Sequence, residues 1–282
     1  MDNRKITEPD LVPQRALYIF LAIAFGLAWG LVGILILFTD AVVRLFGDVS
    51  ASNPLFILAV YSPAIAALLV VWSFAGLKGV KGLLSRLLLW RCSLGWVAFL
   101  IFAIPAIYYA GSFVKGNLFG EPNAFPSIGA AISAMAFMLI LGPVEELGWR
   151  GIALPLLQRR MAPIWAGLVL GSIWGLWHLP AFFLSGTPQS AWGLTPFIIG
   201  SIAVSVILTP LFNQSGGSIL LAALFHFQLN NPIWPDAQPY DTIFFVFAAA
   251  LVVWINRNEM FDRNASVTNI LANTKSAKRA PL

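Results

Sequence analysis

The sequence predicts an all-α protein, a polytopic transmembrane helical bundle of about eight spans. Three observations predict it: the composition, long apolar runs, and one-sided positive charge in the segments between them. Of 282 residues, 59% are hydrophobic and 10% are charged, whereas about 25% are charged in soluble domains. A soluble fold of this size could not bury so many apolar side chains, but a bilayer solvates them. The net charge of +5 therefore indicates membrane topology and not a nucleic-acid partner.

Eight apolar runs are long enough to be spans, since about 20 residues cross roughly 30 Å of hydrocarbon. Gly and Pro inside these runs are tolerated in transmembrane helices. The first run is too long for a cleaved signal sequence and is expected to be a retained span. The predicted spans cover residues 16–38, 54–76, 94–114, 127–158, 162–184, 193–213, 216–231 and 241–256.

The charge of the connecting segments predicts which face of the membrane each one occupies. Only two basic residues of the connections, Arg44 and Lys115, fall on the side opposite the termini. The positive-inside rule therefore predicts a multi-pass protein of the cell membrane with both termini in the cytoplasm. Residues 1–15 would be a cytoplasmic segment, 16–258 the transmembrane domain, and 259–282 a cytoplasmic, disordered tail.

Residues 77–91, between the second and third spans, predict an amphipathic helix on the cytoplasmic leaflet. Leu83, Leu84, Leu87 and Leu88 share one helical face there. A simple helical loop is the alternative.

Ionisable side chains inside spans are costly, and each one therefore indicates function. They are few here and fall on the fourth, fifth and seventh predicted spans: Glu145, Glu146 and Arg150, then His178, then His226 with Asn230. Residues four apart share a helix face, so Glu146 is expected to pair with Arg150. Glu145 lies about 100° further round the helix and is left free for chemistry.

Depth supports a shared site. Counted at 1.5 Å per residue from the cytoplasmic ends of their spans, Glu145 lies roughly 21 Å deep and His178 roughly 24 Å deep. His226 and Asn230 lie roughly 15 and 21 Å deep. A carboxylate, two imidazoles and a carboxamide form a hydrolytic set. Glu145 would accept a proton from water, and a histidine would orient that water or protonate the leaving amine. The second histidine and Asn230 would bind a developing oxyanion.

Three motifs carry a resemblance to a known family. Residues 145–150 have the form E-E-x-x-x-R, residues 174–178 have W-x-x-x-H where the family has F-x-x-x-H, and residues 226–230 have H-x-x-x-N. Their order and separation resemble the CPBP family of intramembrane proteases. That family includes the type II CAAX prenyl endopeptidases and the bacterial Abi proteins linked to bacteriocin self-immunity. The resemblance covers about residues 125–235, which would form the protease core.

The resemblance implies a glutamate-dependent endopeptidase that needs no catalytic metal. Trp174 stands where the family has Phe, so one aromatic residue takes the place of another, a change without evident consequence. The resemblance also implies a role for each motif residue: Glu145 and His178 activate the water, His226 and Asn230 stabilise the oxyanion, and Glu146 and Arg150 support them.

The predicted function is therefore an intramembrane endopeptidase whose active site opens toward the cytoplasm. Its substrate would be a membrane-anchored or amphipathic peptide, prenylated CAAX-type substrates included, that arrives laterally from the bilayer. Three alternatives stay open. Glu145, His178 and His226 could form a His₂Glu zinc site, although no H-E-x-x-H is present. The same groups could relay protons in a transporter. The chain could also be a non-catalytic immunity protein whose polar groups only join helices.

Overall fold

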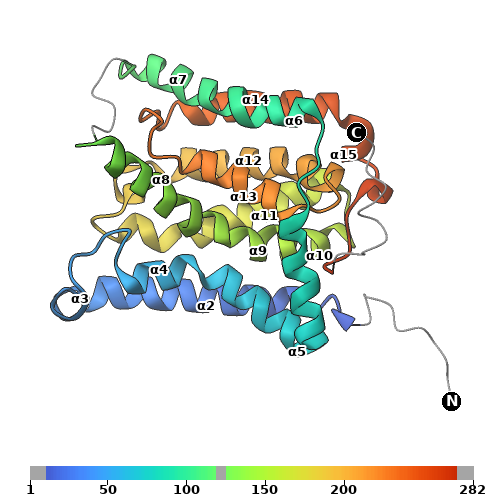
Figure 1. Cartoon of the computed structure of the whole chain (residues 1–282), viewed down its shortest axis with the longest axis horizontal. Helices are drawn as coiled ribbons and strands as arrows, with labels where there is room; N and C mark the ends of the chain where they lie inside the picture. Colours follow the sequence, from blue (N-terminus) through green and yellow to red (C-terminus); the bar gives the residue numbers. More distant parts are fainter. Residues whose placement is uncertain (1–10, 119–124, 272–282) are drawn as a thin grey trace.

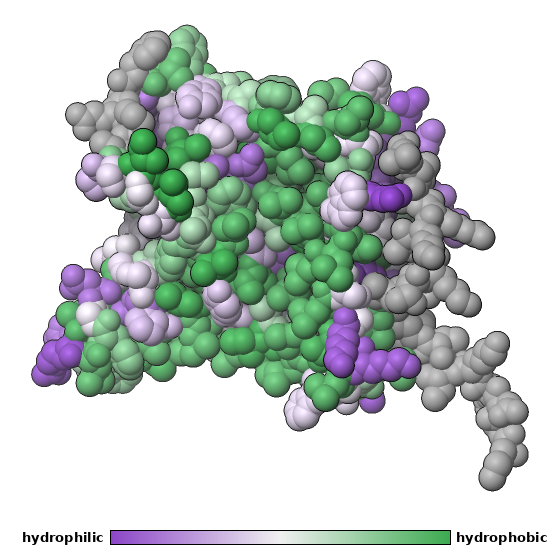
Figure 2. Space-filling view, viewed as in Figure 1, coloured by the Kyte–Doolittle hydropathy of each residue, from purple (hydrophilic) through white to green (hydrophobic). Residues whose placement is uncertain are grey.

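The computed structural model describes residues 11–118 and 125–271, and the described chain is a helical bundle without strands. Figure 1 shows the long helices running side by side, with the start of α2 and the short α15 at the same end. In the described chain, six helical stretches are long and apolar enough to cross a membrane, and two shorter apolar helices accompany them. Figure 2 shows mostly hydrophobic surface between two more polar ends. The predicted all-α membrane bundle is confirmed.

The elements follow the predicted spans closely. The α-helices are α2 (Ala16–Leu37), α3 (Thr39–Phe46), α4 (Pro54–Val60), α5 (Ser62–Leu84), α6 (Leu94–Ala98), α7 (Ile104–Lys115), α8 (Ile128–Leu141), α9 (Glu146–Gly148), α10 (Leu154–Gln158), α11 (Pro163–Trp177), α12 (Leu194–Gln214), α13 (Ile219–Leu229), α14 (Asp241–Ile255) and α15 (Arg257–Met260). Short 3₁₀ turns cover Ser85–Leu88, Pro143–Glu145, Leu179–Phe183, Pro188–Ala191 and Arg263–Ala265, and π-helical turns cover Phe99–Ala103 and Trp149–Ala153.

The second span bends at Gly76, whose φ of 61° is readily available to glycine alone. Beyond it, Figure 1 shows the end of α5 crossing the end of the bundle. A helix therefore forms within the predicted amphipathic segment 77–91. Its Leu83 is fully buried, however, and approaches Gly151 of the fourth span, so this face packs on protein as well.

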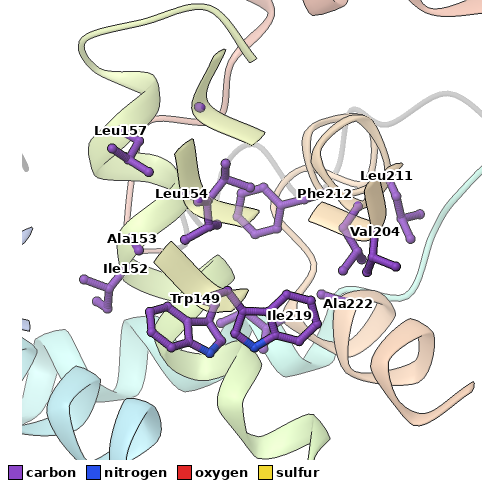
Figure 3. Packing of buried hydrophobic residues seen from close by; sticks show 14 of the residues in the cluster. Trp149, Ile152, Ala153, Leu154, Leu157, Val204, Leu211, Phe212, Ile219 and Ala222 are labelled. Atoms are coloured by element: carbon purple, nitrogen blue, oxygen red, sulfur yellow. The ribbon is translucent and has the colours of Figure 1, made fainter. Parts of the chain in front are cut away.

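The core lies around the fourth span and α11–α13. Glycines let α11 approach α12 closely: a Cβ on Gly171 would lie 2.6 Å from the Cα of Ile202. Small residues serve this purpose in membranes because lipid provides no hydrophobic drive between helices. Figure 3 shows Trp149 and Leu154 of the fourth span packed with Phe212 of α12 and Ile219 of α13. The fourth span is thus held from several sides.

The segment after α15 packs on the end of the bundle that holds the start of α2. The buried Arg86 donates hydrogen bonds to the carbonyl oxygens of Gly217, Asn269 and Ile270. Arg159 likewise donates to the carbonyls of Val12 and Thr268. The buried Arg86 and the half-buried Arg159 therefore hold the backbone of this segment in place.

The prediction of a disordered tail from residue 259 is wrong for residues 259–271. Ile270 is fully buried, and α15 and a further 3₁₀ turn lie in this stretch. Its polar composition indicated disorder, but composition cannot reveal that its carbonyls have buried partners elsewhere in the chain. Residues 272–282, and residues 1–10 of the predicted N-terminal segment, lie outside the described residues.

Replacing Arg86 by Met should loosen this segment. A hydrogen bond from a charged donor contributes about 1.5–3 kcal/mol, so losing even one raises the opened population about tenfold or more. Hydrogen–deuterium exchange at the amide of Val267, which donates to Asn213 Oδ1 at 3.0 Å, measures this opening. Arg263→Met is the control, since Arg263 makes an exposed contact to the Arg159 carbonyl. Equal exchange in the two variants would contradict the role given to Arg86.

Candidate active site

A cavity of about 590 Å³ lies among α2, α4, α8 and α11–α14. Glu145, His178, His226 and Asn230 all line it. The structure therefore brings together the four side chains that the sequence predicted to meet, from three separate spans.

The fourth span is broken where the cavity meets it. Helix α8 ends at Leu141, a 3₁₀ turn covers Pro143–Glu145, and a π-helical turn follows at Trp149–Ala153. Proline has no backbone N–H to donate, so Pro143 favours a change of helix geometry here. Single π-helical turns often occur at functional sites. The break places two neighbouring glutamates in different surroundings.

Glu145 is held by two neutral donors. Its Oε2 accepts hydrogen bonds from Trp149 Nε1 at 3.1 Å and from Trp174 Nε1 at 3.0 Å, and the residue is 3% exposed. Both indoles donate to the same oxygen, which leaves Oε1 outside these two bonds. The prediction that this carboxylate does not share the Arg150 partner of its neighbour is confirmed.

Glu146 is the centre of a buried charge cluster. Its Oε1 lies 2.9 Å from Arg150 Nη1 and 2.7 Å from His226 Nδ1, and all three side chains are buried. The predicted Glu146–Arg150 pair is confirmed. A carboxylate only accepts hydrogen bonds, so Nδ1 of His226 carries a proton. Glu146 thus also fixes the orientation of the imidazole.

Gly142 shows how closely His226 and Asn230 approach the fourth span. A Cβ on Gly142 would lie 3.2 Å from His226 Nε2 and 2.1 Å from Asn230 Nδ2. Any side chain here would displace the carboxamide. His226 Nε2 and Asn230 Nδ2 therefore lie together beside Gly142, which itself lines the cavity.

His178 is oriented by its own helix and by aromatic neighbours. Its Nδ1 lies 2.8 Å from the carbonyl oxygen of Trp174, which can only accept, so Nδ1 is protonated and Nε2 is the basic nitrogen. The ring contacts Trp177 at 4.7 Å and Phe197 at 5.0 Å between centroids, both edge-on. The half-buried imidazole thus has one fixed tautomer.

Sequence reasoning missed the role of the two tryptophans as donors to Glu145. It treated Trp174 as an aromatic substitute, whereas Phe has no N–H to donate. Two signals were present: a buried indole N–H needs a partner, and Trp149 follows Glu145 by four residues. The pairing of Trp174 with Glu145 depends on how α11 is rotated against the fourth span, which spacing within one helix cannot give.

The alternative zinc set is not assembled as a metal cluster. Within residues 11–118 and 125–271, no three His, Cys, Asp or Glu side chains group closely enough to hold a metal ion. Two of the proposed ligands already have hydrogen-bond partners. His226 Nδ1 is hydrogen-bonded to Glu146, and Glu145 Oε2 accepts hydrogen bonds from two indole N–H groups.

The cavity extends to the end of the bundle opposite the start of α2. Residues between helices that line it include Ala51, Gln189, Asn231 and Gln238. Near them, Lys115 Nζ lies 2.6 Å from Asp236 Oδ2. The described connections at the other end, residues 85–93, 159–162 and 215–218, do not line the cavity, and the core around Trp149 packs on that side of Glu145.

Comparisons with known proteins match the segment that forms the site. Residues 127–231 match the family of Rce1-like type II CAAX prenyl endopeptidases. The chain is also 30% identical over 135 residues to a CAAX prenyl protease 2 of Methanococcus maripaludis. This match covers 44% of this chain and 50% of that protein. The chain thus matches about half the length of this relative. The predicted resemblance to CPBP and CAAX proteases is confirmed.

Replacing Trp174 by Phe should lower kcat for peptide cleavage about 10- to 100-fold with little change in KM. The change keeps an aromatic ring but removes one hydrogen bond to a charged group, worth about 1.5–3 kcal/mol. Steady-state kinetics in detergent measures both constants. Trp177→Phe is the matched control, since that indole donates to the Ala24 carbonyl at 3.3 Å and not to Glu145. An equal fall in kcat in both variants would point to packing alone.

Replacing Glu146 by Gln should destabilise the protein, whereas Glu145→Gln should leave it folded and stable. The first change leaves the buried Arg150 charge without its partner, which costs about 3–5 kcal/mol. The second breaks no ion pair, because Glu145 is held by neutral indoles. Thermal unfolding in detergent, followed by tryptophan fluorescence, compares them. If both variants melted alike, the different roles assigned to the two glutamates would be disproved.

Proposed function

We propose that this membrane protein, whose segment 127–231 carries the CAAX-type protease family match, is an intramembrane endopeptidase that uses a glutamate-activated water. The observation that carries the proposal is the position of Glu145. It is held by two neutral indoles in a cavity that His178, His226 and Asn230 also line. A carboxylate without a cationic partner keeps its capacity to accept a proton.

Water attack follows from these positions. Glu145 accepts a proton as the water oxygen bonds to the carbonyl carbon of the substrate, and His178 Nε2 accepts a hydrogen bond that orients the water. The tetrahedral intermediate then collapses, the C–N bond breaks, and the protonated Glu145 returns the proton to the leaving amine. This cycle restores the carboxylate without a change in the net charge of the site.

The oxyanion would be stabilised beside Gly142. Asn230 Nδ2 is a neutral donor there, and His226 Nε2 donates when the ring is protonated. The negative charge of Glu146, 2.7 Å from the other ring nitrogen, offsets the charge of that imidazolium. Glu146 and Arg150 are therefore proposed as positioning residues that do not touch the substrate.

The orientation in the membrane is also part of this proposal, with both termini in the cytoplasm of a multi-pass cell-membrane protein. The distribution of described basic residues supports it, because only Arg44 and Lys115 belong to the end that holds the cavity opening. Nine described basic residues belong to the other end: Arg15, Lys78, Lys81, Arg86, Arg91, Arg159, Arg160, Arg257 and Arg263. This bias is the pattern that the positive-inside rule describes.

Replacing Glu145 by Gln should lower cleavage by at least about 100-fold, since general acid–base catalysis contributes about 10²–10⁴-fold. The assay uses purified protein in detergent and a library of apolar peptides that includes prenylated CAAX-type sequences, because the relative is named a CAAX prenyl protease. Glu259→Gln, which alters an exposed carboxylate, is the control. Retained turnover in Glu145→Gln would refute the mechanism. Loss of wild-type activity on chelation, restored by Zn²⁺, would replace it with the zinc-dependent version.

A further inference from the structure

Helix α13 ends beside the cavity, and each of its last four carbonyls has a hydrogen-bond donor. The last carbonyls of a helix need partners from beyond that helix. The first two of the four accept the backbone N–H of Asn230, at 3.2 and 3.0 Å. The Gln228 carbonyl accepts from Trp234 Nε1 at 2.9 Å. The Leu229 carbonyl accepts from the hydroxyl of Tyr108 at 2.8 Å. Side chains of the third span and of the connection to α14 therefore hold this end of the helix.

The carboxamide of Asn230 depends on this backbone for its position. Within residues 11–118 and 125–271 it makes no hydrogen bond, and the residue is exposed where it lines the cavity. His226, one turn earlier, is held differently, because its Nδ1 lies 2.7 Å from Glu146. Gly142 leaves room for the carboxamide, but only the end of α13 sets how far Asn230 Nδ2 lies from the fourth span.

Tyr108 lies on a helix that is seated closely against α14. A Cβ on Gly111, which shares a helix face with Tyr108, would lie 2.8 Å from the backbone nitrogen of Asp241 and 2.9 Å from Ala237 Cβ. Figure 1 shows α7 running beside α14. The ring of Tyr108 also packs edge-on against Phe245, at 6.0 Å between centroids. The hydroxyl is thus presented to the Leu229 carbonyl from a fixed position.

The hydroxyl of Tyr108 carries a single proton, and that proton is used on the Leu229 carbonyl. Tyr108 lines the cavity, yet it does not donate to a bound substrate. Removing the hydroxyl would leave the carbonyl without its donor in apolar surroundings, which favours opening of the last turn of α13. Asn230 would move with that turn, and a displacement of about 1 Å at a reacting group can cost about 10²-fold in rate.

We propose that Tyr108 is a positioning residue for the oxyanion site. Its hydroxyl fixes the last turn of α13 and, through it, the place of Asn230 Nδ2 beside Gly142. The inference rests on the proposed function, in which that nitrogen donates to the oxyanion. It brings the third span into the site, although this span carries none of the three motifs and lies outside the matched segment 127–231.

Hydrogen–deuterium exchange tests the hold on Asn230 independently of activity. A neutral hydrogen bond corresponds to about a 2- to 10-fold change in an equilibrium constant. Tyr108→Phe should therefore speed exchange of the Asn230 amide about 3- to 10-fold in detergent. Exchange of the Leu221 amide, which donates to Ser218 Oγ at 3.0 Å at the start of α13, should stay unchanged. Unchanged exchange at Asn230 would overturn the inference.

Tyr109→Phe is the matched control for this measurement. It removes a hydroxyl from the neighbouring residue of α7, and that hydroxyl makes no hydrogen bond within the described chain. The contact of its ring with Trp234, at 6.3 Å between centroids, is kept by Phe. Exchange at Asn230 should match that of the wild type. Equal acceleration in Tyr109→Phe and Tyr108→Phe would show that the bond to Leu229 is not the cause.

A double-mutant cycle tests whether this hold acts through Asn230. Tyr108→Phe should lower kcat about 3- to 10-fold with little change in KM, since a transition-state donor is misplaced. In an Asn230→Ala background, the same change should lower kcat by less than about twofold, because interacting residues are not additive. An equal fall in both backgrounds would indicate a general structural effect and overturn this inference alone. Absence of cleavage by the wild type, or an Asn230→Ala variant as fast as the wild type, would count against the proposed function.

Discussion

The carboxylate of Glu146 lies between Arg150 Nη1 at 2.9 Å and His226 Nδ1 at 2.7 Å, and Glu146 and Arg150 are fully buried. In hydrocarbon, neither charge could remain alone, so each helix that carries a member must keep its position. This pairing commits Arg150 to Glu146. Glu145 is held instead by the neutral indoles of Trp149 and Trp174, and its proposed role in proton transfer depends on that difference.

Trp174 connects the two systems. Its indole N–H donates to Glu145, while the guanidinium of Arg150 lies 5.2 Å from its ring centroid. An aromatic face attracts a cation, and this attraction is greater in a desolvated setting. The same side chain therefore helps to hold Arg150 and the carboxylate of Glu145, the proposed proton acceptor. Its backbone carbonyl also fixes the tautomer of His178, so this one residue of α11 contacts Glu145, Arg150 and His178.

Hydropathy predicted the spans to within a few residues, as the sixth and eighth show: 193–213 against Leu194–Gln214, and 241–256 against Asp241–Ile255. The length of an apolar run can be counted along the sequence, and the thickness of the bilayer sets the length that a span needs. The fourth span was less predictable. Its break at Pro143 turns Glu145 and Glu146 toward different partners, and those partners come from other helices. Spacing along one helix predicted the Glu146–Arg150 pair but could not predict an indole from α11.

The end of the bundle that the cavity reaches agrees with the depth of Glu145 counted from the sequence. Counting residues placed Glu145 roughly 21 Å from the basic end of a membrane about 30 Å thick, which is nearer to the opposite face. The packed core that fills the longer side also excludes water from the Glu146–Arg150 pair, where low dielectric strengthens the ion pair. The cavity thus reaches Glu145, whereas Glu146 and Arg150 are not among the residues that line it.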